Sequence, residues 1–142
     1  MKVQILRAKN STFIAKGDSN HWVVIDTEKE FGGSEAGSRP MEMLLSSLGG
    51  CTGIDVETLL NKMRATVDDF QIDIQAERRS EHPRIFTQIT IRFLFWGEEL
   101  NADAIHKAVR LSSEKYCPVT AMLRQSVPIT TEILLNPPKE DN

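Results

Sequence analysis

Cys51 and Cys117 are the residues of this sequence whose side chains could do covalent chemistry. They are the only two cysteines in a chain of 142 residues. A thiolate is a nucleophile, and two thiols can also close and reopen a disulfide during turnover. Because nothing in the sequence suggests secretion, we expect a free or transiently paired thiol couple rather than a structural disulfide.

The two thiols have different local settings. Cys117 precedes Pro118 at a predicted helix start, where free N–H groups and the helix dipole favour the thiolate. Cys51 lies within Met43–Ile54, a segment that carries no charge. Burial alone raises the pKa of a thiol, so Cys51 needs a cation from elsewhere in the chain to become reactive. Each cysteine could instead be a small buried hydrophobe, which is a common role of free Cys.

The elements that must position the thiols belong to an α+β fold. A long helix is predicted over Pro40–Ala65, where apolar residues recur every three or four positions. Strict alternation from Phe70 to Glu77 and from Ile85 to Phe95 predicts an antiparallel hairpin. The other predicted elements are short strands within residues 1–26, a helix from Asn101 to about Lys115, a short helix from Cys117 to about Ser126, and a last strand over Ile129–Leu135. The fold class is therefore α+β, an antiparallel sheet with one long central helix and two shorter helices.

Composition limits the class of partner. With 40% apolar and 26% charged residues the chain is an ordinary globular protein, and we expect one domain over residues 1–142. The net charge of -3 is spread along the chain, which argues against nucleic acid or a membrane as partner. The first residues contain no apolar stretch typical of a signal peptide, so we expect a cytoplasmic protein. Loops are predicted at Lys29–Arg39 and at the tail, Asn136–Asn142.

The uncharged segment also predicts an assembly. Met43–Ile54 is apolar or small on every side, so it should be buried all round. A domain of this size has little room for a helix that is covered on every side. A partner chain could supply the missing cover, and we therefore expect a homodimer.

Two motifs resemble those of one known family. Arg39-Pro-Met-Glu-Met-Leu-Leu-Ser-Ser-Leu-Gly-Gly-Cys51-Thr-Gly-Ile-Asp55 resembles the Pro-x-Glu-Leu-Leu…Cys helix of the OsmC/Ohr family. Ser113-Glu-Lys-Tyr-Cys117-Pro-Val-Thr resembles the second Cys-Pro site of the same family. The order of elements around both motifs also matches, so the resemblance covers nearly the whole chain.

The resemblance implies a fold, an assembly and a reaction. It implies an intertwined homodimer with its central helices packed together and two active sites near the interface. In the peroxidase members the first cysteine attacks a hydroperoxide, and the second converts the resulting sulfenic acid into a disulfide that a dithiol reduces. By this resemblance Cys51 is peroxidatic and Cys117 is resolving, in stress defence against organic hydroperoxides or hydrogen peroxide. Their sulfurs should then lie within reach of a bond.

The sequence departs from the peroxidase pattern around Cys51. Those enzymes have a Glu ten residues before the first cysteine, where it holds an Arg against the thiolate. Met41 stands at that position here, and Glu42 is its neighbour. Arg7 is the only Arg before Arg39, so Glu42 and Arg7 are the predicted supporting pair, with Arg39 as a second candidate. A non-catalytic dimeric stress or ligand-binding protein, whose cysteines are not turned over, therefore stays open beside the peroxidase.

The remaining polar residues predict no further site. Neither a cofactor nor a metal is expected, because the three histidines share no metal spacing with the cysteines. His106 is expected on a helix surface. Asp55 lies four residues after Cys51 on the same helix face, where an unpaired carboxylate disfavours the thiolate. We therefore interpret Asp55 as a polar group whose charge is satisfied at an interface.

Overall fold

The computed structural model describes residues 1–139, and the end of the predicted tail loop, residues 140–142, lies outside them. The chain forms two compact units, Met1–Ser46 and Ser47 onward. The first holds strands β1 (Val3–Lys9), β2 (Thr12–Gly17), β3 (Trp22–Ile25) and the 3-10 turn η1 (Lys29–Phe31). Helix α1 (Pro40–Met63) crosses the boundary, followed by β4 (Asp69–Arg78), β5 (Phe86–Trp96), α2 (Ala102–Leu111), the π-helical turn η2 (Ser112–Tyr116), α3 (Pro118–Leu123) and β6 (Ile129–Leu135).

The first unit is a three-stranded antiparallel sheet in the order β1-β2-β3. Asn10 and Asn20 take left-handed φ angles of 51° and 63° at the two turns between these strands. Asparagine tolerates this conformation better than most residues, which explains why the chain reverses there. The short strands predicted within residues 1–26 are confirmed.

Asp26 holds the loop that follows β3. Its side chain is only 2% exposed and accepts hydrogen bonds from the Thr12 hydroxyl at 3.0 Å and from the backbone N–H groups of Thr27, Ser34 and Ala36 at 2.8, 3.2 and 3.0 Å. The Ala36 N–H contributes most to lowering the pKa of Asp26, and burial opposes it. The carboxylate therefore fastens the predicted loop to the sheet.

Both ends of α1 are set by local chemistry. Pro40 opens the helix, and the Glu42 carboxylate accepts the Arg39 N–H at 3.0 Å, which satisfies one free donor of the first turn. The helix ends at Met63, two residues before the predicted end, because Arg64 takes a φ of 54°. The Ala65 N–H then bonds to the Leu60 carbonyl at 3.1 Å, as in a Schellman motif.

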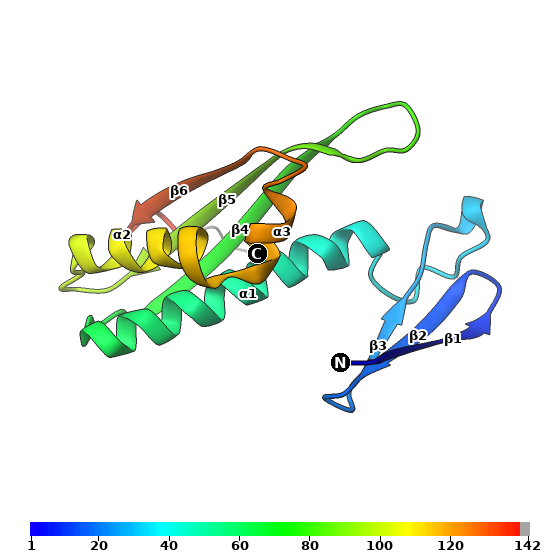
Figure 1. The fold of residues 1–142 in the computed structure, drawn as a ribbon, viewed down its shortest axis with the longest axis horizontal. Coiled ribbons are helices and arrows are strands. Elements are labelled where there is room, and N and C mark those ends of the chain that lie inside the picture. Colours follow the sequence, from blue (N-terminus) through cyan, green and yellow to red (C-terminus); the bar gives the residue numbers. More distant parts are fainter. Residues whose placement is uncertain (140–142) are drawn as a thin grey trace. The chain divides into compact units, whose positions relative to one another are not determined.

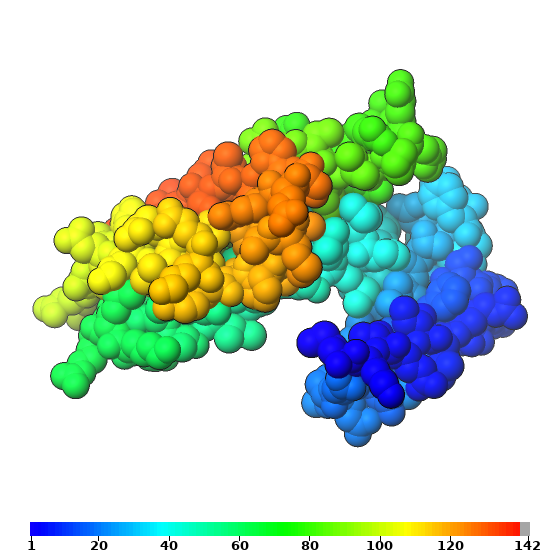
Figure 2. All heavy atoms as spheres, viewed as in Figure 1, coloured from blue at the N-terminus to red at the C-terminus, as the bar shows by residue number. Residues whose placement is uncertain are grey.

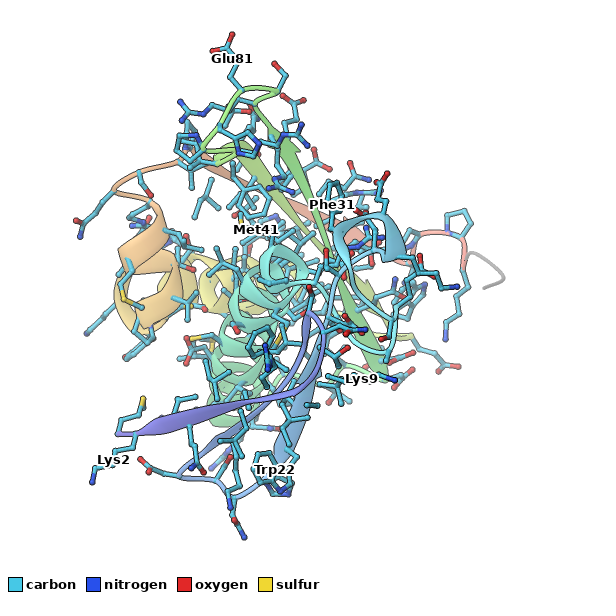
Figure 3. All side chains as sticks on the ribbon, turned by 90° about the vertical axis from the view of Figure 1, so that its right-hand side faces the viewer. Lys2, Lys9, Trp22, Phe31, Met41 and Glu81 are labelled. Atoms are coloured by element: carbon cyan, nitrogen blue, oxygen red, sulfur yellow. The ribbon has the colours of Figure 1, made fainter. Side chains whose placement is uncertain are left out.

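The second unit packs helices on one side of a sheet in the order β4-β5-β6 (Figures 1 and 3). The Cα atoms of Gly49 and Gly53 face β4, where an added Cβ would meet Ile74 at 3.2 Å and Ile72 at 3.1 Å. Leu48 and Val56 of α1 are fully buried, as is Phe95 of β5. The predicted α+β class with its β4–β5 hairpin is confirmed. β6 pairs with β5 in the parallel direction, because the chain returns through α2 and α3 as a crossover.

The segment predicted to be buried all round is open on one side within the single chain. Leu48 and Thr52 are buried, but Ile54 is 71% exposed. A Cβ atom added at Gly50 would have no other atom within 4 Å. None of the helices in residues 1–139 is both long and apolar enough to cross a membrane.

We predict that Asp26→Asn destabilises the protein at neutral pH and removes part of its acid sensitivity. The folded pKa of Asp26 lies below the unfolded value of about 3.9, so its contribution is present above that value and is lost as the pH falls through the folded pKa. Denaturant unfolding at several pH values measures this. The exposed carboxylate of Asp18 gives the control, Asp18→Asn, which should match the native protein. An identical acid dependence for Asp26→Asn would contradict the assignment.

Candidate active site

Helix α1 positions Cys51 through its packing on β4. Thr52, the next residue, is 2% exposed, and its hydroxyl donates to the Leu48 carbonyl at 3.0 Å. The close approach of Gly49 and Gly53 to the strand fixes the rotation of the helix. Cys51 is therefore held half-buried at the edge of the packed face.

The chain geometry before α3 positions Cys117. Its N–H donates to the Ser112 carbonyl at 2.9 Å, closing the π-helical turn η2. Pro118 disfavours helical geometry in the residue before it, and Cys117 takes extended angles of φ -71° and ψ 107°. Its sulfur then caps α3 by accepting the Thr120 N–H at 3.3 Å. Cys117 is 2% exposed, and in Figure 2 the orange spheres of this segment lie against those of α1.

The two sulfurs and one carboxylate meet at this point. The sulfurs of Cys51 and Cys117 and an oxygen of Asp55 all lie within 4.8 Å of one another. A disulfide needs a sulfur–sulfur distance of about 2.05 Å, so a modest movement of either side chain would allow the bond. Both cysteines are free thiols here. The expected proximity of the two sulfurs is confirmed.

Asp55 and Ser112 are the neighbours that sequence reasoning did not assign to the site. The Ser112 hydroxyl, fully buried, donates to the Asp55 carboxylate at 3.2 Å and lies 3.5 Å from the Thr52 carbonyl. Asp55 thus has a hydrogen-bond partner within its own chain, and its expected place at an interface stays a prediction. The four-residue spacing from Cys51 was the available signal for Asp55. Ser112 carried none, because only the fold brings η2 to α1.

The electrostatics of the site oppose ionisation of Cys51. Burial raises the pKa of its thiol most, and the neighbouring Cys117 and the Asp55 charge raise it further. The Val119 N–H acts in the opposite direction. None of these groups is a cation, so the activating charge predicted for Cys51 is not among the groups that shift its pKa.

Comparison with known proteins identifies the family. The family described as OsmC-like protein matches residues 32–132 of the sequence. This chain belongs to the OsmC-like family. The OsmC-like chain is 40% identical to Protein YhfA of Escherichia coli K12 over 130 residues, 92% of this chain and 94% of the relative.

Solved structures of other OsmC-like folds are also similar. A hypothetical protein from Aquifex aeolicus VF5 is 33% identical with a TM-score of 0.79, covering 96% of this chain and 97% of that one. A protein from Legionella pneumophila, described as organic hydroperoxide resistance protein OsmC, is 13% identical with a TM-score of 0.69. The alignment covers 94% of this chain and 95% of the Legionella protein, and at that identity the likeness concerns the fold alone.

The residues proposed to support Cys51 have contacts of their own in this OsmC-like protein. Glu42 forms an ion pair with Arg39 at 3.6 Å, and Arg39 also pairs with Glu28 at 3.0 Å. Arg7 is exposed on β1, opposite Phe13. Met41, labelled in Figure 3, lies in the first turn of α1. These residues belong to the first unit, and a role for Glu42 or Arg7 at Cys51 stays a prediction.

The histidines and a surface hollow lie outside the thiol cluster. His106 is exposed and its Nδ1 lies 2.8 Å from the Ala102 carbonyl, so the expected place on a helix surface is confirmed. A hollow of about 500 Å³ lies between α2 and β6, and neither cysteine lines it. The hollow is open to solvent and is lined in part by the exposed side chains of Lys107 and Arg110, so it is a surface depression rather than a site for thiol chemistry.

We predict that Asp55→Asn lowers the pKa of the Cys51 thiol and increases its reactivity near neutral pH, because a negative charge is removed beside the sulfur. The measurement is the pH dependence of iodoacetamide alkylation in a Cys117→Ser background, where Cys51 is the one remaining thiol. Glu57→Gln is the matched control, since Glu57 is an exposed acid of the same helix that bonds to Asn61. An unchanged pH profile for Asp55→Asn would show that the carboxylate does not act on Cys51.

Proposed function

We propose that this OsmC-like protein is a thiol-dependent peroxidase that reduces organic hydroperoxides or hydrogen peroxide in stress defence. The observation that carries the proposal is the pair of free thiols whose sulfurs lie within 4.8 Å. Two adjacent thiols with different exposure suit a reaction in which the more exposed thiol attacks the substrate and the buried thiol then forms the disulfide. Cys51 is half-buried and Cys117 is buried, which matches peroxidatic and resolving roles.

The first step transfers one oxygen atom to sulfur. The Cys51 thiolate attacks the O–O bond of ROOH, which breaks to give the Cys51 sulfenic acid and an alkoxide that takes a proton to leave as ROH. Cys51 is oxidised and the peroxide is reduced. The thiol proton passes to solvent before the attack, a step that the Asp55 charge beside the sulfur disfavours.

The second and third steps restore the thiols. The Cys117 sulfur attacks the sulfenic sulfur, a disulfide forms, and water leaves with the sulfenic oxygen and the Cys117 proton. A small dithiol then reduces the Cys51–Cys117 disulfide by exchange, becoming a disulfide itself. The capping contact of Cys117 with the Thr120 N–H holds its sulfur beside Cys51 for this condensation.

The comparisons support this class of activity at the level of the fold. The Legionella protein is described by its organic hydroperoxide resistance, and it shares the arrangement of elements that carries the two cysteines here. The family membership adds that the match includes both cysteine segments, since residues 32–132 contain Cys51 and Cys117.

A second candidate function is a non-catalytic dimeric stress or ligand-binding protein. The observation that favours it is the charge balance around Cys51, where burial, Cys117 and Asp55 all raise the thiol pKa. Met41 in place of a Glu favours the same alternative. In that case the two cysteines would stay reduced when peroxide is present.

We predict that cumene hydroperoxide with dihydrolipoamide is turned over by the native protein, with two thiols lost per chain in the absence of reductant. Cys51→Ser should abolish turnover, because the remaining thiol is buried. Cys117→Ser should allow a single oxidation followed by over-oxidation, because the sulfenic acid then has no partner. Thiol counting follows the loss and recovery of the thiols. Intact-mass measurement should show added oxygen atoms only in Cys117→Ser. Thiols that persist through prolonged exposure to peroxide would favour the non-catalytic alternative.

We further propose that the protein is a homodimer, as the OsmC/Ohr resemblance implies. Exposed apolar side chains support this assembly, since large patches of this kind mark interaction surfaces. In the first unit they lie on the sheet, where Figure 3 labels Trp22, and in the second Ile54 extends from α1. The exposed apolar residues of the sheet are Val3, Ile5, Leu6, Phe13, Trp22, Val23 and Val24.

We predict that Gly50→Arg gives a folded protein that dimerises less. A side chain at Gly50 meets no atom of its own chain within 4 Å, so the fold should tolerate the arginine, whereas a charge in a helix–helix interface would be buried without a partner. Sedimentation at micromolar concentration measures the dimer, and circular dichroism checks the fold. Asn61→Arg, an exposed position nearer the end of α1, is the control that should remain dimeric. A native protein that is already monomeric would refute the assembly.

A further inference from the structure

We infer that the reduced form of this site binds a thiophilic divalent cation, of which Zn²⁺ is the best match, through the sulfurs of Cys51 and Cys117 and the carboxylate of Asp55. Two of the three donor atoms come from residues one helical turn apart on α1, and the third comes from the cap of α3. Two sulfurs and one carboxylate oxygen are donor types that Zn²⁺ accepts in proteins. This inference extends the thiol site beyond the proposed peroxidase, and it does not depend on peroxide turnover.

The distances suit a tetrahedral ion. Sulfur ligands at about 2.3 Å from zinc lie about 3.8 Å apart in tetrahedral geometry, and a carboxylate oxygen lies slightly closer to each sulfur. The three donor atoms here are all within 4.8 Å of one another. A contraction of about 1 Å or less, which side-chain rotation can supply, would bring them onto one ion.

The surroundings resemble the outer shell of a metal site. The buried Ser112 hydroxyl donates to Asp55 Oδ2 at 3.2 Å and so orients the carboxylate toward the sulfurs. Outer-shell hydrogen bonds of this kind fix ligating carboxylates in known sites. Thr120 is 1% exposed, and its buried hydroxyl has no hydrogen-bond partner among residues 1–139, whereas its backbone N–H donates to the Cys117 sulfur. A buried hydroxyl beside a ligand could serve a water bound at the fourth position.

Charge balance favours the ion when the thiols are reduced. Binding replaces the two thiol protons, so the reaction is two thiols plus Zn²⁺ giving a zinc dithiolate and two protons, with no change of oxidation state. The Asp55 charge, which opposes a free thiolate, then contributes to binding. Three protein ligands leave one position for water, as in open zinc sites. Oxidation to a disulfide removes both sulfur ligands and would release the ion, so metal and peroxide compete for the same thiols.

The test uses the full-length reduced protein after removal of metal by chelation. Titration with Zn²⁺ should give one ion per chain, with release of about two protons at a pH where both thiols are protonated. Titration with Co²⁺ should give the thiolate-to-cobalt charge-transfer band in the near ultraviolet together with the visible bands of a tetrahedral ion. Bound Zn²⁺ should also protect both thiols from alkylation. Absence of stoichiometric binding, or a Co²⁺ spectrum without thiolate bands, would overturn the inference.

Variants separate this site from adventitious binding. Ser112→Ala should weaken Zn²⁺ binding about tenfold, as loss of an outer-shell hydrogen bond does in other sites, and Asp55→Asn, which removes a ligand, should weaken it by at least as much. Glu57→Gln should bind like the native protein, because its carboxylate is exposed and paired with Asn61. Equal affinity in Asp55→Asn and the native protein would overturn the carboxylate ligand. Should Asp55→Asn fail to fold, Cys51→Ser decides, since loss of one sulfur must remove stoichiometric binding.

The same samples distinguish failure of this inference from failure of the proposed function. If the protein binds one Zn²⁺ through these residues but leaves peroxide unchanged, the metal-site inference stands and the peroxidase proposal is wrong. If the protein turns over peroxide but binds no Zn²⁺, the peroxidase proposal stands and the metal-site inference is wrong. Peroxide turnover that slows in proportion to zinc occupancy and recovers on chelation would support both.

Discussion

The close packing of α1 on β4 is the constraint on which the rest of the thiol site depends. The helix backbone lies so close to the strand at Gly49 and Gly53 that a Cβ atom at these positions would meet Ile74 at 3.2 Å and Ile72 at 3.1 Å. Glycine within a helix costs about 1 kcal/mol relative to alanine, so two glycines on one face need a packing reason. Here they fix the rotation of α1, and with it the direction in which Cys51 and Asp55 face α3.

The second partner of the site is fixed by a local rule rather than by packing. Proline after Cys117 prevents helical geometry at the cysteine, and the π-helical turn from Ser112 to Tyr116 absorbs the change of direction. The buried sulfur then caps the next helix. A short segment therefore delivers both Cys117 and the Ser112 hydroxyl to one face of α1, although neither is near Cys51 in the sequence.

The resulting cluster of two thiols and a carboxylate has opposing chemical tendencies. Without a cation, burial, the neighbouring Cys117 and the Asp55 charge raise the pKa of the Cys51 thiol, which works against a fast nucleophile. With a cation, from a basic side chain or a metal, the same proximity becomes favourable. A basic side chain beside the sulfurs would thus make the site a peroxidase and a metal ion would make it a metal-binding site. Without either cation the two thiols would be unreactive.

The sequence by itself determined the elements and the two cysteines. Hydrophobic periodicity found α1 and the β4–β5 hairpin, and the last strand lies over Ile129–Leu135 as predicted. These features depend on neighbouring residues, which the sequence displays directly. The end of α1 was less well defined, because a left-handed Arg64 has no strong local signal.

Only the tertiary structure decided what surrounds the thiols. The hydrogen bond from Ser112 to Asp55 joins residues far apart in the chain, so no local pattern could predict it. The parallel pairing of β6 with β5 likewise follows from the path of the crossover through α2 and α3. The sequence named Cys51 and Cys117 as reactive candidates, and the fold determined that the Asp55 carboxylate lies beside both sulfurs, because burial and charge are properties of what packs around a residue.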